Sequence, residues 1–293
     1  MATRTEPMAP QLAPPTLPRW AEQFIEANGM RTRFFQAGQG PPLLLIPSVF
    51  LQAASYRGTI EALAEHFQVT VAEMPGSGLS ERVKQPWGFA EGADWAAALL
   101  DALNLDRALV VGHSDTGAVA ALMGVRHPSR LDGLVMVDSV GGLPGATWWS
   151  LLKSRLRDGL MEESRLNLPL TPHMLANLVR HTRNCLYHAF WLAASTEPLE
   201  VAPQIEAPTL LAWGRRDYTF PPHCAERFHA AIRDSRIAWS EASHDWLILH
   251  PLEFADAVAA FAREQGLLPA GASDAIRDRS RPPCFSPTQP NLY

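Results

Sequence analysis

The chain has 293 residues, 47% of them hydrophobic, which is enough for one large α/β domain with a sizeable core. Its formal net charge of −5 excludes an extensive basic surface of the kind that binds nucleic acid. The three cysteines are scattered and odd in number, so they do not indicate a disulfide framework, and a cytoplasmic location is expected. No apolar run approaches the roughly 20 residues that span a bilayer, so no membrane partner is expected.

Both ends of the chain are rich in proline. Residues 1–19 contain prolines at 7, 10, 14, 15 and 18 and lack the continuous apolar core of a secretory signal. Residues 269–293 combine prolines with charges and cannot bury enough apolar surface to become ordered alone. We therefore predict an N-terminal arm over 1–19 and a C-terminal tail over 269–293.

Between these ends, short apolar strands alternate with amphipathic helices. Asn28-Gly29 is typical of a two-residue hairpin turn and predicts an antiparallel opening up to Ala37. Leu43–Ile46 is wholly apolar, as a strand buried on both faces requires. Helices are predicted at about 59–66 and 90–103, and further strands at 69–72, 108–111, 134–138, 209–213 and 236–239. This order predicts an α/β fold with a mostly parallel sheet and helices on both faces.

The alternation lapses between Asp138 and Thr209. Residues 145–203 look helical throughout and are rich in leucine and tryptophan. We interpret them as an inserted helical cap. The core domain then consists of residues 20–144 and 204–268.

The stretch from Ala108 to Ala120 has the layout of a nucleophile elbow. An apolar strand stops at Gly112, a hydroxyl follows at Ser114, and a helical stretch of small residues begins at once. In an elbow, a tight turn holds the nucleophile in a strained backbone conformation. Small residues two before and two after it let strand and helix pass closely; Gly112 fits, but Thr116 stands where glycine is expected. Thr116 predicts an altered helix approach or oxyanion pocket and a narrow substrate range.

A second register of the elbow remains open. Reading it one residue later makes Asp115 the nucleophile, with Gly117 two positions further on. That register places His113 two residues before the nucleophile, where a bulky side chain crowds the turn. Ser114 is therefore favoured.

In chain order, these features resemble the α/β-hydrolase fold superfamily over about residues 24–266. In that family a serine nucleophile follows the fifth strand, an acid the seventh and a histidine the eighth, which implies Ser114, Asp217 and His244 here. The imidazole takes the hydroxyl proton and the carboxylate fixes its tautomer. Asp138 is the alternative acid, because it also ends a strand and certain lactonases of the superfamily take their acid there. The Gly-x-x-Asp loop ending at Asp217 favours that residue.

The resemblance also implies an oxyanion hole. One donor is the backbone N–H after the nucleophile, at Asp115, and the other comes from the loop after the third strand, at Val49. Pro47-Ser48 replaces the family's usual His-Gly in that loop. We predict substrate contacts from residues of this loop, the elbow, the cap and the histidine loop: Ser48, Phe50, His113, Trp148, Trp149, Trp191 and Trp246.

One group of cap residues has a spacing that could hold a metal. His181, Cys185 and His188 fall at i, i+4 and i+7, on one face of a helix. No fourth ligand is evident, so an ordinary helix face is favoured and neither metal nor cofactor is expected.

These features predict a hydrolase that cleaves an ester or lactone of a fairly bulky apolar substrate through an acyl-enzyme. The same scaffold also supports C–C bond hydrolysis, acyl transfer or peracid formation. A further alternative is a hydrolase-like protein that binds a hydrophobic small molecule without turnover. A small-molecule substrate is the expected partner, and a homodimer is compatible with the sequence.

Overall fold

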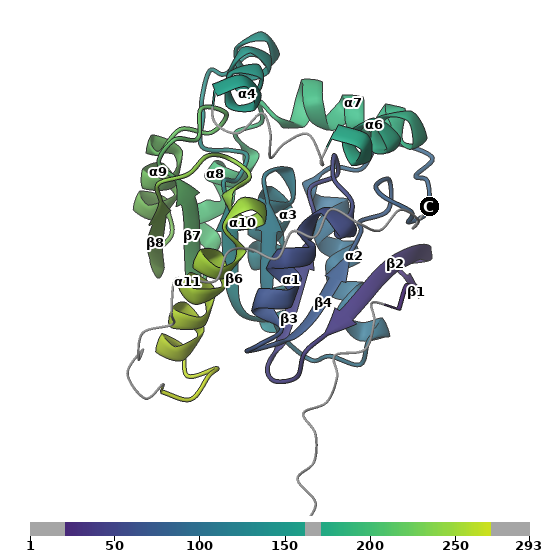
Figure 1. Cartoon of the computed structure of the whole chain (residues 1–293), viewed down its shortest axis with the longest axis vertical. Helices are drawn as coiled ribbons and strands as arrows, with labels where there is room; N and C mark the ends of the chain where they lie inside the picture. The colour runs from purple at the N-terminus through teal and green to yellow at the C-terminus, as the bar shows by residue number, and fades with distance from the viewer. Residues whose placement is uncertain (1–20, 162–170, 271–293) are drawn as a thin grey trace, which may run out of the picture.

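The computed structural model describes residues 21–161 and 171–270, apart from the side chains of 159–161 and 171 (Figure 1). The predicted arm over 1–19 and nearly all of the predicted tail over 269–293 lie outside these residues. Within them, no helix is long and apolar enough to cross a membrane.

An eight-stranded sheet forms the centre of the described chain, in the order β1-β2-β4-β3-β5-β6-β7-β8. The β1–β2 hairpin turns at Asn28-Gly29, and its second strand, β2, pairs antiparallel with β4. The pairings among β3 to β8 are all parallel. The strands are β1 Gln23–Ala27, β2 Met30–Ala37, β3 Pro42–Ile46, β4 Gln68–Ala72, β5 Ala108–His113, β6 Leu131–Val137, β7 Thr209–Gly214 and β8 Ser235–Ser240. The predicted mostly parallel sheet is confirmed.

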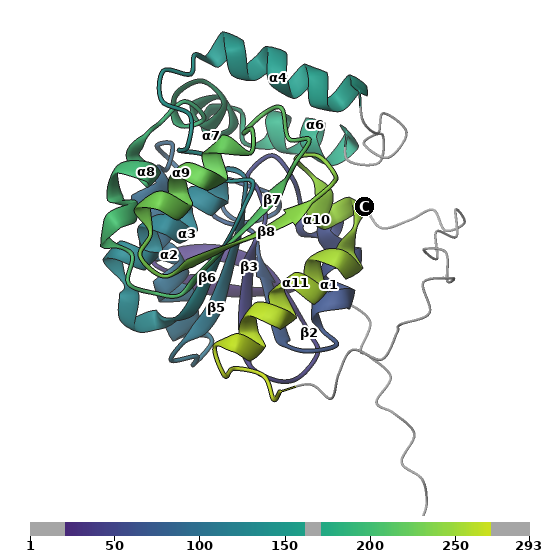
Figure 2. The same ribbon diagram turned by 90° about the vertical axis from the view of Figure 1, so that its left-hand side faces the viewer.

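Helices cover both faces of the sheet, and each face has its own core (Figures 1 and 2). In β3, Leu44 and Ile46 belong to one core while Leu43 and Leu45 belong to the other, which explains its wholly apolar sequence. The helices outside the segment that joins β6 to β7 are α1 Arg57–Leu63, α2 Phe89–Ala102, α3 Asp115–Arg126, α9 His223–Ala231, α10 Trp246–Leu249 and α11 Pro251–Glu264, with 3₁₀ turns η1 Ala53–Tyr56 and η2 Pro128–Arg130.

The segment between β6 and β7 has helices and no strand in its described part. It contains α4 Trp148–Met161, α6 Thr171–Arg180, α7 Thr182–Tyr187, the π-helical turn η3 His188–Leu192, α8 Glu197–Val201 and the 3₁₀ turn η4 Ala202–Gln204. In both ribbon views α4, α6 and α7 lie beyond one end of the sheet (Figures 1 and 2). We call α4, α6, α7 and η3 the cap helices.

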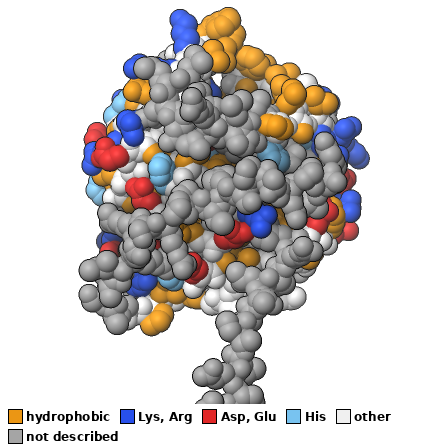
Figure 3. Space-filling model, viewed as in Figure 1, with side chains coloured by type: hydrophobic (Ala, Val, Ile, Leu, Met, Phe, Trp, Pro, Cys, Tyr) orange, Lys and Arg blue, Asp and Glu red, His pale blue; other side chains and the backbone are white. Residues whose placement is uncertain are grey.

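Exposed apolar side chains gather on the cap helices. Figure 3 shows hydrophobic side chains along the edge of the molecule where these helices lie. Trp149 is 58% exposed and Trp191 is 67% exposed. The other large exposed apolar residues of the cap helices are Leu152, Leu156, Leu175, Leu178, Val179, Leu186 and Phe190.

Candidate active site

The turn between β5 and α3 has the geometry of a nucleophile elbow. Ser114 has φ 59° and ψ −116°, a conformation that costs free energy for any residue with a Cβ. The Ser114 N–H donates to the Val137 carbonyl at 2.8 Å, and its carbonyl accepts from Val140 N–H at 3.1 Å. A Cβ on Gly112 would lie 2.1 Å from the Thr116 carbonyl oxygen. Strand and helix therefore pass so closely that only glycine fits at 112.

Thr116 stands where glycine was expected. Its side chain is accommodated because the hydroxyl forms hydrogen bonds with the backbone at the ends of β3 and β5. Its hydroxyl donates to the Ile46 carbonyl at 2.7 Å and accepts from His113 N–H at 3.0 Å. The close packing falls instead on the next residue, Gly117, where a Cβ would lie 2.7 Å from the Ser139 side chain. The threonine thus ties the elbow to the end of β3.

The structure brings Ser114, His244 and Asp217 together in one hydrogen-bonded row. The His244 Nε2 atom lies 3.0 Å from Ser114 Oγ, and its Nδ1 atom lies 2.9 Å from Asp217 Oδ2. His244 and Asp217 are buried, while Ser114 is partly exposed. Burial of the ring disfavours its charge, but the Asp217 carboxylate outweighs this and raises the pKa of His244. Nδ1–H therefore donates to Asp217, and the Nε2 lone pair faces the serine hydroxyl.

Asp138, the alternative acid, lies beside this row rather than in it. Its Oδ1 accepts from Gly214 N–H at 2.9 Å, and no bond joins it to the His244 ring. Burial, together with the neighbouring charge of Asp217, raises the pKa of Asp138 well above its usual value. Burial and the neighbouring charge thus disfavour the ionised form of Asp138, and Asp217 is the acid that contacts His244.

His113 is buried next to the row and hydrogen-bonds to residues around it, and its contact with substrate stays a prediction. Ser48 N–H donates to the Tyr56 hydroxyl at 3.0 Å, and that hydroxyl lies 2.8 Å from His113 Nδ1. The other ring nitrogen, Nε2, lies 3.1 Å from the His244 carbonyl oxygen. Because the ring is 1% exposed, burial lowers the pKa of His113 to about 4, so it stays neutral. It therefore accepts from Tyr56 and donates to the His244 carbonyl.

The two residues expected to supply oxyanion donors also meet. Val49 N–H lies 3.3 Å from Asp115 Oδ2, and Ser48 Oγ donates to Asp115 Oδ1 at 2.6 Å. The Ser48 hydroxyl is therefore engaged by Asp115. The Asp115 carboxylate is directed at this loop and at His188 Nδ1, 2.9 Å from Oδ2. This arrangement favours the elbow register in which Ser114 is the nucleophile, because Ser114, and not Asp115, faces His244.

Helix α4 contacts the loops that carry the histidine and the acid, which sequence reasoning missed. Arg155 Nη2 donates to Asp245 Oδ2 at 2.8 Å, next to His244. Asp158 accepts from Tyr218 N–H at 3.0 Å and from the Thr219 hydroxyl, next to Asp217. Arg155 and Asp158 are three residues apart, so the sequence indicates that they share one face of a helix. No sequence pattern predicts which residues they bond.

The predicted aromatic contacts divide into two groups. Trp246 is 1% exposed and packs edge-on against Phe254 in the core between the sheet and α11, and its contact with substrate stays a prediction. Trp148 stacks on Trp149 at 3.6 Å between ring centroids and lies edge-on to Phe190 at 5.0 Å. Trp149 and Trp191 are mostly exposed, and their contact with substrate stays a prediction.

Phe50 is partly buried against the core on the α2 and α3 side, and its substrate contact likewise stays a prediction.

The three cap residues with metal-ligand spacing do not converge. His181 Nε2 bonds the Gly78 carbonyl at 2.9 Å, and His188 Nε2 bonds the Trp87 carbonyl at 3.1 Å. Burial raises the pKa of the Cys185 thiol to about 12, so it is a poor thiolate ligand. In residues 21–161 and 171–270, the groups close enough to share a metal are His113, His244 and Asp245, and Asp138, Asp217 and His244.

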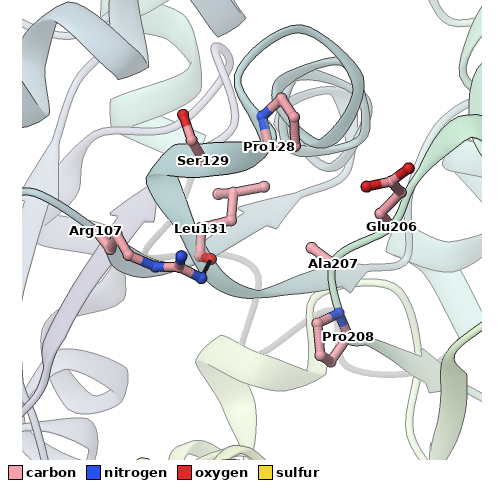
Figure 4. Close-up of a pocket in the computed structure, with 7 residues that line it drawn as sticks. All are labelled: Arg107, Pro128, Ser129, Leu131, Glu206, Ala207 and Pro208. Atoms are coloured by element: carbon pink, nitrogen blue, oxygen red, sulfur yellow. Dashed lines mark hydrogen bonds between the residues drawn. The ribbon is translucent and has the colours of Figure 1, made fainter.

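A pocket of about 350 Å³ lies at the opposite end of the sheet, where β5, β6 and β7 begin (Figure 4). The residues around it come from the chain segments that precede these strands: Arg107, Pro128, Ser129, Leu131, Glu206, Ala207 and Pro208. The Arg107 guanidinium is already bonded there to the Leu131 carbonyl and to Asp132. The pocket is therefore separate from the row of Ser114, His244 and Asp217.

Comparisons with known proteins bear on the fold and the family. The family model for the alpha/beta hydrolase fold matches residues 41–158. An uncharacterized protein of Mycobacterium tuberculosis is 27% identical over 85% of this chain and 82% of its own. The 2-hydroxy-6-oxo-2,4-heptadienoate hydrolase of Pseudomonas putida is 28% identical over 73% of this chain and 86% of its own. The enol-lactonase structure from Burkholderia xenovorans superposes with a TM-score of 0.71 at 19% identity, covering 82% of this chain and all of that one.

Proposed function

The chain belongs to the α/β-hydrolase fold superfamily, and from that premise we propose that it is a serine hydrolase that cleaves a carboxylic ester or lactone. The observation that carries the proposal is the row Ser114 Oγ, His244 Nε2 at 3.0 Å, and Asp217 Oδ2 at 2.9 Å from His244 Nδ1. A nucleophile, a base and an orienting acid at these distances are what acyl transfer to serine requires.

In the first half-reaction Ser114 Oγ attacks the substrate carbonyl while His244 Nε2 takes the hydroxyl proton. Asp217 holds the resulting imidazolium and keeps Nδ1 protonated. The tetrahedral oxyanion accepts from the backbone N–H groups of Val49 and Asp115. The Val49 N–H contact with the Asp115 side chain, at 3.3 Å, is long and is exchanged for the oxyanion at little cost.

The intermediate then collapses with cleavage of the carbonyl–oxygen bond. His244 returns its proton to the leaving alcohol, and Ser114 keeps the acyl group. A water molecule, deprotonated by the same imidazole, attacks the acyl-enzyme, and the second tetrahedral intermediate releases the carboxylic acid and regenerates Ser114.

The charges around the row favour an uncharged substrate. Asp115, Asp217 and Asp245 are buried carboxyls beside it, and Arg155, the guanidinium bonded next to His244, is already paired with Asp245. Arg155 and its surroundings hold the pKa of Asp245 at about 2, against the effect of burial. Because the Arg155 guanidinium is committed to Asp245, it does not attract an anionic acyl group to the site. Esters or lactones of uncharged, apolar acids therefore fit best.

C–C bond hydrolysis is the second candidate, because the Pseudomonas putida relative is named as a heptadienoate hydrolase. The row of serine, histidine and aspartate serves this reaction equally well, with an enolate instead of an alkoxide as leaving group. The substrate named for that relative is an anion, whereas the Arg155 guanidinium next to His244 is already paired with Asp245 and is not free to bind a substrate carboxylate. The affinity of the site for a substrate carboxylate is thus the property that separates the two candidates.

The experiment has two stages. Purified protein is first treated with a fluorophosphonate probe, with Ser114→Ala and a known esterase as controls. Labelling of the native protein and not of the variant supports the proposal, whereas an unlabelled native protein beside a labelled esterase indicates a binding protein without turnover. Fresh, unlabelled enzyme is then tested on p-nitrophenyl esters, lactones and vinylogous diketones with and without a carboxylate. Faster turnover of the anionic diketones than of any ester or lactone contradicts the ester and lactone assignment.

A further inference from the structure

A buried carboxylate joins the elbow, the loop after β3 and the cap. Asp115, the first residue of α3, is 3% exposed, and His188, in η3, is 1% exposed. Asp115 Oδ1 accepts from Ser48 Oγ at 2.6 Å, and Oδ2 lies 3.3 Å from Val49 N and 2.9 Å from His188 Nδ1. These contacts occupy both carboxylate oxygens, so Asp115 has an internal role.

The contacts fix where the protons lie. His188 Nε2 is 3.1 Å from the Trp87 carbonyl oxygen, which can only accept, so Nε2 carries a proton. A neutral ring would then present the Nδ1 lone pair to a carboxylate oxygen at 2.9 Å, which is repulsive. Nδ1 is buried and makes no well-aligned hydrogen bond, so the contact with Asp115 is held by charge and distance.

The carboxylate is the partner that keeps its charge. It receives the Ser48 hydroxyl and the Val49 N–H, and it lies at the N-terminus of α3, where a negative charge is favourable. Attraction at this distance therefore requires the second proton to be on His188 Nδ1. The pair is an imidazolium beside a carboxylate, and its sum of charges is zero.

We infer that His188, as an imidazolium, is a positioning residue of the oxyanion site: it neutralises the Asp115 carboxylate next to the N–H groups that hold the oxyanion. This inference rests on the proposed function. A carboxylate without a counter-charge would repel a developing oxyanion strongly in a buried, weakly polarisable site. It would also compete with the oxyanion for Val49 N–H. The cap thereby contributes to the reaction through His188, a residue that does not itself contact the substrate.

The first test removes the counter-charge. His188→Leu is expected to lower kcat on a p-nitrophenyl ester about 100-fold, the size of effect seen when oxyanion stabilisation is lost, with KM changed less than threefold. His181→Leu is the matched control. The His181 ring also bonds a backbone carbonyl, Gly78 at 2.9 Å, and in the described part of the chain it pairs with no carboxylate. A His188→Leu kcat within threefold of the His181→Leu value overturns the inference.

The second test is a rescue that a purely structural role would not produce. Asp115→Asn in the His188→Leu background removes the uncompensated charge while an amide oxygen still accepts from Val49 N–H. We expect at least a tenfold recovery of kcat over His188→Leu alone. A double variant as slow as, or slower than, the single variant contradicts charge neutralisation.

A third measurement does not depend on turnover. In the native protein labelled with ¹⁵N-histidine, both ring nitrogens of His188 should be protonated at neutral pH, assigned by loss of the signal in His188→Gln. An Nε2–H ring with a bare Nδ1 overturns the inference. If the native protein shows the imidazolium but is not labelled by fluorophosphonate, the proposed function fails and the charge pair stands.

Discussion

Replacing Asp217 with asparagine is the sharpest test of which acid serves His244. The Asp217 Oδ1 atom accepts from two backbone donors, Thr219 N–H at 2.7 Å and Phe220 N–H at 2.8 Å. An asparagine must keep its oxygen on these donors, because its NH₂ group cannot accept. The NH₂ group then faces His244 Nδ1, 2.9 Å away, and forces that nitrogen to become the acceptor.

The expected loss follows from the tautomer. With Nδ1 accepting, the ring proton moves to Nε2, which then cannot take the proton of Ser114. Trapping the base in the wrong tautomer costs about 10⁴-fold in kcat for a serine, histidine and aspartate triad, or about 5 kcal/mol of activation free energy. Asp138→Asn, the matched variant, should cost less than tenfold, because the Asp138 carboxyl accepts from Gly214 N–H and makes no bond to the ring.

The assay is steady-state hydrolysis of the best p-nitrophenyl ester, together with the rate of fluorophosphonate labelling. Circular dichroism of both variants controls for folding. The reasoning is refuted if Asp217→Asn keeps more than a tenth of the native kcat, or if Asp138→Asn is the more damaging change. A double variant also identifies any residual activity in Asp217→Asn for which Asp138 acts as the acid.

Three further predictions concern the same end of the sheet. Because Asp217 raises the pKa of His244 above 6.5 and the ring must be neutral to act as base, kcat/KM should fall as the pH drops, with its midpoint above 6.5; a midpoint below 6 contradicts this. Gly112→Ala would place a Cβ 2.1 Å from the Thr116 carbonyl oxygen and should abolish soluble expression or lower Tm by more than 10 °C, whereas a native Tm refutes the close approach. Arg155→Met leaves the buried Asp245 carboxylate without its cation; since Arg155 is 34% exposed, we expect a loss of about 2 kcal/mol in urea unfolding at pH 7, and no loss would show that solvent already screens the pair.

The parts of the site that were predictable are those that local pattern encodes. An apolar strand that stops at Gly112 before Ser114 predicts a strand–turn–helix junction, and the structure has one there. The order of serine, acid and histidine along the chain follows the strand order, so Asp217 and His244 were identifiable before the structure placed them beside Ser114. The choice between Asp217 and Asp138 depended on which carboxyl reaches the ring.

The parts that were missed are contacts between segments far apart in sequence. His188 stood out only as a member of a helical face with His181 and Cys185, a spacing that could hold a metal but that favoured an ordinary helix face. In the structure the helix places its ring against Asp115, 73 residues earlier in the chain, at 2.9 Å. The charge pair arises from how the cap sits over the elbow, and the periodicity of one helix carries no information about that.

Helix α4 bears on how the molecule moves. Through Arg155 and Asp158 it is bonded to the loop of His244 and to the loop of Asp217, which together hold the base and its acid. A displacement of α4 would break the ion pair between Arg155 and Asp245 and, at the same time, leave Tyr218 N–H without its acceptor, Asp158. The backbone amides of α4 should therefore exchange hydrogen at the rate of the Tyr218 amide, and not at the rate of amides on the cap surface. On heating, unfolding of the cap and displacement of the His244 base would then occur in one transition. A curve of activity against temperature would report both.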